Sequence, residues 1–141
     1  MVGGAGNDEI WGGPGGADTL TGGMGADRYW YYKGDGNVVI TADSANNLDR
    51  IEFADATAGE LNYALSGNDL VITITGSAGS LTVKDWTLSA GNRIGTLHAT
   101  DGNATVSLTV MGTAGNDNLV GFAGNDTLNL SRIHITQRRV R

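Results

Sequence analysis

Five aspartates could do chemistry, because each closes a glycine-rich run of the same design. The runs read GGAGNDEIW (3–11), GGPGGADTLT (12–21), GGMGADRYW (22–30), GTAGNDNLV (112–120) and GFAGNDTLN (121–129). Their aspartates are Asp8, Asp18, Asp27, Asp117 and Asp126, spaced by ten and nine residues in the first block and by nine in the second. A carboxylate at a fixed offset from a flexible turn is a candidate ligand for a cation.

The glycines before each aspartate predict a tight turn, because glycine adopts backbone angles that are closed to other residues. Several carbonyl oxygens then point to one side, where the carboxylate joins them. The residues after the aspartate predict a short strand with one apolar residue facing inward, namely Ile10, Leu20, Tyr29, Leu119 and Leu128. Two units make one full coil, so turns on the same side stack every second unit.

This stacking predicts a cation between turns that lie two units apart. Calcium accepts many carbonyl and carboxylate oxygens in flexible geometry, whereas magnesium demands a stricter octahedron and keeps its water. Asp8 and Asp27 are expected to share one ion with carbonyls of 3–6 and 22–25. The expected ligands of this first site are Gly3, Ala5, Asp8, Gly23, Gly25 and Asp27.

The units resemble the nonapeptide repeats of RTX (repeats-in-toxin) proteins, whose parallel β-roll binds calcium. They cover about a third of the chain. The segment KGDGNVVI (33–40) is similar to the degenerate closing unit of such arrays, with Val38 in place of its last aspartate. A second, weaker site is expected between 12–18 and 34–38, with Gly12, Pro14, Asp18 and Asp35 as ligands. The alternative to a ligand role for Asp35 is that it is a solvated turn residue.

The fold class expected from these patterns is all-β. Residues 1–40 are predicted to form the β-roll, and 41–110 a β-rich capping domain that resembles the domain following the repeats in haemolysin-type proteins. Alternating apolar residues predict a hairpin over 66–86 and strands in 49–56 and 92–110, the last with a turn at 101–103. Residues 111–130 form a second, incomplete repeat block, in which Asp117 and Asp126 are half-sites, and 131–141 form a basic tail.

Composition excludes several classes of function. The chain has 141 residues with no cysteine, so disulfides and thiolate metal sites are absent. Four of its nine bases lie in the last ten residues, which leaves 15 acids and five bases before them, a net charge of −10. Such a body repels nucleic acid and attracts cations. No apolar run is long enough to span a membrane.

Catalytic signatures are also missing from the sequence. His98 and His134 are the only histidines, and neither a G-x-S-x-G elbow nor an H-E-x-x-H motif occurs. We therefore expect no active site in this chain. RTX arrays are commonly attached to secreted enzymes, adhesins and toxins, so the resemblance allows an enzyme as the parent protein.

The function expected from the resemblance is calcium binding that triggers folding of a scaffold module, in the C-terminal region of a protein secreted by bacteria through type I export. Calcium is the expected partner, and the open roll edges can self-associate. Two alternatives remain: a fragment of a secreted hydrolase or other enzyme, or an adhesive or surface-active module for a cell-surface, carbohydrate or lipid partner. The adhesive alternative uses exposed aromatic residues among Trp11, Tyr29, Trp30, Tyr31 and Tyr32. Alternate burial of Tyr29 and Tyr31 against Trp30 and Tyr32 is the expected arrangement of RYWYY (28–32).

Overall fold

The computed structural model describes residues 1–42, 48–111 and 127–129. The chain divides into two compact units, 1–105 and 106–141. The strands of the first unit are β1 (Val2–Ala5), β2 (Glu9–Trp11), β3 (Ala17–Met24), β4 (Arg28–Tyr31), β5 (Gly36–Thr41), β6 (Arg50–Phe53), β7 (Leu61–Ser66), β8 (Asp69–Ile74), β9 (Gly79–Val83), β10 (Thr96–Ala99) and β11 (Gly102–Ala104). Two short 3-10 helices, η1 (Ala58–Glu60) and η2 (Ala90–Asn92), lie between strands.

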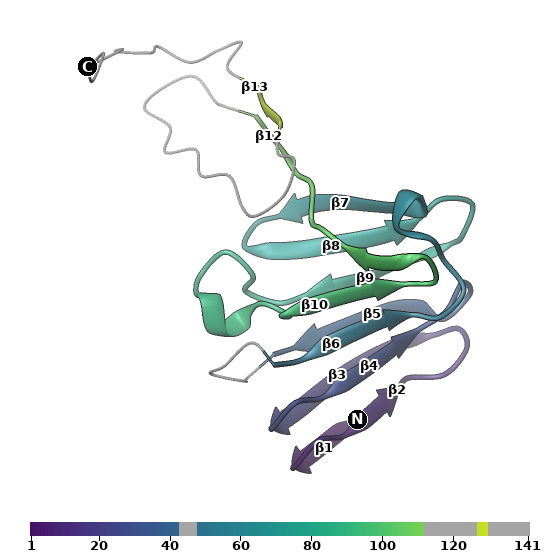
Figure 1. The fold of residues 1–141 in the computed structure, drawn as a ribbon, viewed down its shortest axis with the longest axis vertical. Helices are drawn as coiled ribbons and strands as arrows, with labels where there is room; N and C mark the ends of the chain where they lie inside the picture. The colour runs from purple at the N-terminus through teal and green to yellow at the C-terminus, as the bar shows by residue number, and fades with distance from the viewer. Residues whose placement is uncertain (43–47, 112–126, 130–141) are drawn as a thin grey trace. The chain divides into compact units, whose positions relative to one another are not determined.

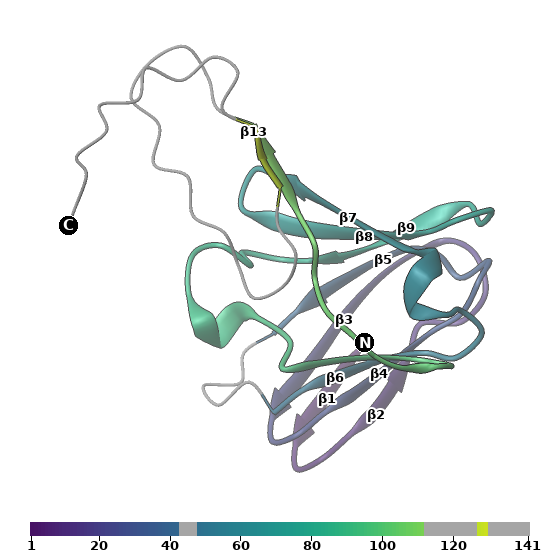
Figure 2. The ribbon, with the colours of Figure 1, turned by 45° about the horizontal axis from the view of Figure 1, so that its top comes forward.

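The strands of the first unit form two sheets, between which the successive strands β1 to β6 alternate (Figure 1). One sheet has the order β1-β3-β5-β9-β8-β7, and the other has the order β11-β10-β6-β4-β2. The strand pairs along β1-β3-β5-β9 in the first sheet and along β2-β4-β6-β10 in the second sheet are all parallel. Figure 2 shows the two sheets as separate layers. The chain thus winds as a parallel roll, and the all-β fold class predicted from the repeats is confirmed.

Columns of apolar side chains between the two sheets form the core. Ile10, Tyr29, Ile51 and Leu97 occupy one register position on four successive strands, and all four are buried. Leu20, Ile40 and Val83 form the facing column. Each short strand thus contributes one or two inward residues, and burial of the whole column stabilises strands that could not persist singly.

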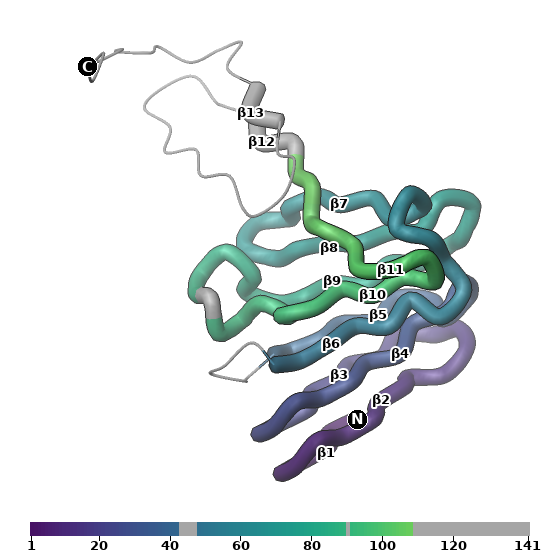
Figure 3. Tube along the Cα trace, viewed as in Figure 1, coloured from purple at the N-terminus to yellow at the C-terminus, as the bar shows by residue number. Residues whose placement is uncertain are grey.

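Residues 49–104 extend these sheets instead of standing beside them. β6, β9 and β10 add to the parallel ladders, and the antiparallel strands β8, β7 and β11 then end them (Figure 3). The predicted hairpin is β8–β9, and the predicted strands in 49–56 and 92–110 include β6, β10 and β11. The expected alternation in RYWYY is confirmed for Tyr29 and Tyr31, which are buried, and for Tyr32, which is exposed, whereas Trp30 is half-buried.

The second unit contains one short parallel pair, β12 (Thr109–Met111) with β13 (Thr127–Asn129). The aspartates predicted as half-sites, Asp117 and Asp126, and the basic tail lie outside the described residues. Among the residues that the structure describes, no helix is long and apolar enough to cross a membrane.

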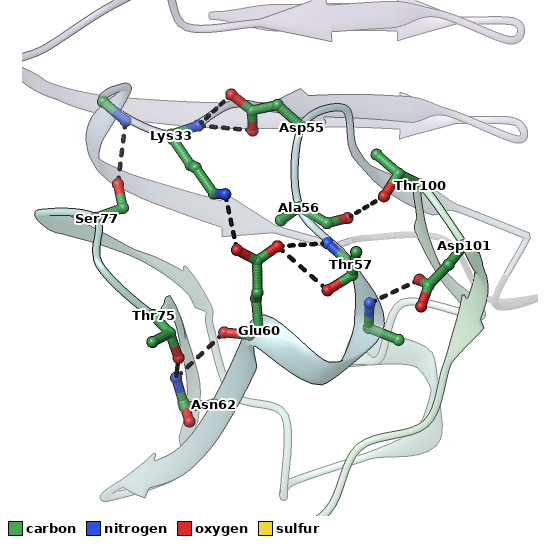
Figure 4. A network of polar contacts seen from close by, with 12 residues as sticks. Lys33, Asp55, Ala56, Thr57, Glu60, Asn62, Thr75, Ser77, Thr100 and Asp101 are labelled. Carbon is green, nitrogen blue, oxygen red and sulfur yellow. Dashed lines mark hydrogen bonds and ion pairs between the residues drawn. The ribbon is translucent and has the colours of Figure 1, made fainter.

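A polar network joins the loops on one side of the roll (Figure 4). The Lys33 ammonium donates to Glu60 Oε1 at 2.9 Å, and the Lys33 backbone N–H donates to the Asp55 carboxylate. Glu60 Oε2 accepts from the Thr57 backbone N–H at 2.8 Å. Hydrogen bonds from Lys33, then from the Thr57 backbone, lower the pKa of Glu60 from 4.5 to about 2. The charged form of Glu60 therefore favours the folded loops.

This pKa shift predicts a pH-dependent contribution of Glu60 to stability. Because the folded pKa is depressed, the contribution is present above pH 4.5 and is lost as the pH falls toward about 2. The melting temperature of wild type should exceed that of Glu60→Gln at neutral pH, and the difference should shrink over that acid interval. Since the Glu60 side chain is 35% exposed, we expect a small difference. A difference that stays constant down to pH 2 would contradict the assignment.

Candidate metal centre

The aspartate of each early unit lies against the first glycine of the same unit. A Cβ atom on Gly3 would lie 2.5 Å from Asp8 Oδ2, and one on Gly12 would lie 2.7 Å from Asp18 Oδ2. A Cβ on Gly22 would collide with Asp27 Oδ2 in the same way. These glycines are therefore needed for space, because any side chain would displace the carboxylate.

The second and fourth positions of a unit need glycine for another reason. Gly23 and Gly25 have φ angles of +102° and +134°, which other residues rarely adopt. A Cβ on either would also collide with the carbonyl oxygen of Gly4 or Gly6 in the coil beneath. The Asn7 side chain adds to this stacking, because its Oδ1 accepts from the Ala26 N–H at 2.9 Å. Consecutive coils therefore approach closely along these turns.

Three aspartates form a column along one side of the roll. The Asp8 N–H donates to Asp27 Oδ1 at 2.9 Å, and the Asp27 N–H donates to Asp49 Oδ1 at 3.0 Å. Asp27 and Asp49 are each 1% exposed. The structure thus brings together Asp8 and Asp27, the pair expected to share one ion. The aspartate column is the name used below for Asp8, Asp27 and Asp49.

The other oxygens of this column identify a candidate cation site. Among the described residues, Asp8 Oδ2 and Asp27 Oδ2 are buried without a hydrogen-bond partner. An ionised oxygen that is buried and unpaired is strongly unfavourable unless a cation compensates it. The Gly22 carbonyl oxygen would lie 2.6 Å from the Gly3 Cβ that also approaches Asp8 Oδ2. Carboxylate and carbonyl oxygens of successive coils therefore converge, and the residues present fit a calcium ion.

The donor set favours a hard cation. Among the residues that the structure describes, no group of three or more His, Cys, Asp or Glu side chains could hold a metal by itself. Backbone carbonyls must therefore supply much of any coordination shell, and calcium accepts such ligands. Ala5, Gly23 and Gly25, the other expected ligands, belong to the same stacked turns. A cleft of about 290 Å³ adjoins the column, lined by Asn7, Asp8, Glu9, Ala26, Asp27, Arg28, Leu48 and Arg50.

The turns on the opposite side of the roll do not stack one carboxylate on another in the way that Asp8 and Asp27 do. Asp18 is in register with Val38, which is buried, so no second carboxylate occupies that position of the next coil. Pro14 is exposed in the turn that Gly12 opens. Whether Gly12, Pro14 and Asp18 bind a metal stays a prediction.

Asp35 is a buried turn residue, so its solvated alternative is wrong. It is 2% exposed, and its Oδ2 accepts from Trp11 Nε1 at 2.9 Å and from the Tyr32 N–H at 2.8 Å. Burial and the Asp35 charge raise the pKa of Tyr31, whose hydroxyl donates to the Gly36 carbonyl. Two protein donors already serve this oxygen, and a ligand role for Asp35 stays a prediction.

Sequence reasoning missed Asp49, because it lies outside any glycine-rich unit. A signal was present: Asp27-Arg28-Tyr29 and Asp49-Arg50-Ile51 share the pattern Asp-Arg followed by an inward apolar residue. The backbone confirms their equivalence, since Arg28 N–H donates to Asp8 O and Arg50 N–H donates to Asp27 O, each at 2.8 Å.

Comparison with family models agrees with this geometry. The model of the RTX calcium-binding nonapeptide repeat (4 copies) matches residues 1–29, 15–38 and 109–132. The model of the haemolysin-type calcium binding protein related domain matches residues 69–102. These matches show that the chain carries RTX-type calcium-binding repeats. A search of curated proteins finds no match.

The family assignment bears on the other expectations. RTX repeats are typically non-catalytic. The matched segment 109–132 includes Asp117 and Asp126, which lie outside the described residues. The match over 69–102 covers the strands β8 to β10, so the haemolysin-type resemblance falls on residues that continue the RTX sheets.

Substitution of Gly22 tests whether this glycine is required because a side chain would have no space. In Gly22→Ala the new methyl group would displace the Asp27 carboxylate and the Tyr29 hydroxyl. We expect a loss of about 1–3 kcal/mol in the free energy of unfolding with calcium present. Gly59→Ala is the matched control, because nothing lies within 4 Å of its added Cβ. Chemical denaturation measures both, and equal stabilities would contradict this account of the turn.

Proposed function

We propose that the first site lies between the stacked turns of Asp8 and Asp27, and that calcium binding there triggers folding of a scaffold module in a secreted RTX protein. The observation that carries this proposal is the pair of buried oxygens, Asp8 Oδ2 and Asp27 Oδ2, without a hydrogen-bond partner among the described residues. Gly3, Ala5, Gly23 and Gly25 belong to the same turns, and their carbonyls would complete the shell.

The aspartate column supplies the coupling between binding and folding. Neighbouring strands lie about 4.8 Å apart, and two unit charges at that separation repel by about 3 to 4 kcal/mol at an effective dielectric constant of about 20. The 23 glycines add a large loss of conformational entropy on folding. A bound calcium ion supplies positive charge that opposes the repulsion. Because the unfolded chain holds no such site, binding free energy becomes folding free energy.

The calcium concentration needed would suit a secreted protein. Extracellular calcium modules work at roughly 10⁻⁴–10⁻³ M, far above cytosolic calcium. A segment with this requirement stays unfolded inside the cell, passes through a type I export channel, and folds outside. RTX haemolysin-type proteins are generally secreted by bacteria, which supports this part of the proposal.

The antiparallel strands would act as the cap of the roll. β7, β8 and β11 follow the last parallel strands of the two sheets, so they cover edges that another coil would otherwise extend. Asp18 would contribute to a weaker site on the opposite side, and Asp117 and Asp126 would contribute half-sites of the second block. No part of this function requires catalysis by the chain itself.

Calcium titration tests the proposed coupling. After chelator treatment, far-ultraviolet circular dichroism should show little β-structure, and calcium should restore it cooperatively. Magnesium at the same concentration should not, because its strict octahedral geometry suits the turns less well. A chain that is fully folded in chelator, with no response to calcium, would overturn the proposed trigger.

Asp27→Asn tests the position of the site. Asn is nearly isosteric but removes one charge from the aspartate column, so the calcium midpoint of folding should rise at least about tenfold. Asp85→Asn is the matched control, because Asp85 is exposed at a positive φ of 53°, which Asn tolerates. An unchanged midpoint in Asp27→Asn, measured beside the control, would place the site elsewhere.

A further inference from the structure

The outer face of the sheet β2-β4-β6-β10 has a feature that calcium binding leaves unexplained. Inward residues such as Ile10 and Tyr29 are buried, so their neighbours along each strand face outward. Trp11 and Trp30 are register partners on the adjacent parallel strands β2 and β4, and both project from this outer face. Tyr32 follows β4 directly, and the three rings are called the aromatic platform below.

In the aromatic platform, the Tyr32 ring pairs with both tryptophan rings. The centroids of Trp11 and Tyr32 lie 5.5 Å apart with an interplanar angle of 61°, and those of Trp30 and Tyr32 lie 6.5 Å apart at 20°. Trp11 is 45% exposed and Tyr32 is 36% exposed. An aromatic surface that remains this accessible marks an interaction site when its rings are contiguous.

Fixed hydrogen bonds hold the platform in place. The buried carboxylate of Asp35 accepts from Trp11 Nε1 and from the Tyr32 N–H with the same oxygen. Arg28 lies over the Trp30 ring, with its guanidinium carbon 5.9 Å from the ring centroid. The indole hydrogen bond holds the Trp11 ring, and the backbone hydrogen bond holds the Tyr32 main chain, so a ligand would meet a partly preorganised surface.

Paired charges lie beside the rings on the same face. The Arg28 guanidinium contacts Glu9 at 3.0 Å and Glu52 at 3.6 Å. Glu52 also contacts Arg50, and His98 Nδ1 at 2.7 Å. Glu52 and His98 continue the register row of Trp11 and Trp30 on β6 and β10. The strip therefore offers hydrogen-bond donors and acceptors with little net charge.

We propose that the aromatic platform binds a neutral carbohydrate chain. A sugar ring presents a flat C–H face, which packs on aromatic rings, and hydroxyl groups, which suit paired donors and acceptors such as Arg28 and Glu9. An apolar lipid or protein surface would have to desolvate those ion pairs without replacing their water. An acidic ligand would meet a chain of net charge −6.

The test uses the calcium-saturated protein and three neutral hexasaccharides, cellohexaose, maltohexaose and mannohexaose. Intrinsic tryptophan fluorescence and calorimetry should detect binding of at least one of them at concentrations up to about 10 mM. Trp30→Ala should weaken that binding about tenfold or more, whereas Trp30→Phe should retain most of it. Leu88→Ala is the matched control, because Leu88 is also an exposed apolar residue but is not part of the platform.

Circular dichroism in calcium checks that each variant folds. If Trp30→Ala does not fold, Tyr32→Ala and Trp11→Ala test the same platform, since each should weaken binding beyond Leu88→Ala. Absence of binding to all three hexasaccharides by folded wild type would overturn the proposal. Binding that is unchanged in the platform variants would overturn it too. Sedimentation that shows a dimer abolished by Trp30→Ala would assign the face to a second copy instead.

Discussion

The packing of a carboxylate against a bare glycine is the constraint on which the roll depends. Asp8, Asp18 and Asp27 each occupy the space that a side chain on the first glycine of the same unit would need. The same contact sets how closely the carboxylate lies to the backbone of its own turn, because only a glycine hydrogen atom lies between them. In this position the Asp27 carboxylate accepts a hydrogen bond from the Asp8 N–H. This hydrogen bond fixes the register of one coil on the next. Stacking, strand pairing and the candidate metal centre therefore share one cause.

A narrow roll must obtain its stability from columns of stacked apolar side chains instead of a broad hydrophobic core. Each coil contributes single inward residues such as Ile10 and Leu20, and these gain full burial only when neighbouring coils cover them. Glycine-rich turns add entropy loss but little apolar area. Electrostatics in the turns consequently carries unusual weight, since the hydrophobic contribution per residue is small. The extension of both sheets through β9 and β10 lengthens these columns beyond the repeats themselves.

The sequence was sufficient for features that depend on local spacing. The phase of the repeats predicted the two-sided winding, the pairing of Asp8 with Asp27 and the inward position of Tyr29. Features that depend on distant contacts were not predictable in this way. Asp49 joins the aspartate column across a 22-residue separation, and β9 pairs with β5 only after a hairpin intervenes. Asp35 was misjudged as a solvated alternative because its donor, Trp11, lies 24 residues away.

Asp35 and the aspartate column differ in how the protein compensates their buried carboxylate oxygens. Asp35 and Asp27 are equally buried carboxylates in glycine-rich turns. An indole and a backbone N–H both donate to Asp35 Oδ2, so hydrogen bonds replace the water that this oxygen loses. Asp27 Oδ2 has no such donor among the described residues. The number of protein donors, and not the presence of an aspartate, is therefore the criterion by which we propose that one turn is structural and the other would need a cation. By this criterion, under the proposed function, we expect the side of the roll that carries the aspartate column to depend on calcium more strongly than the side that carries Asp35.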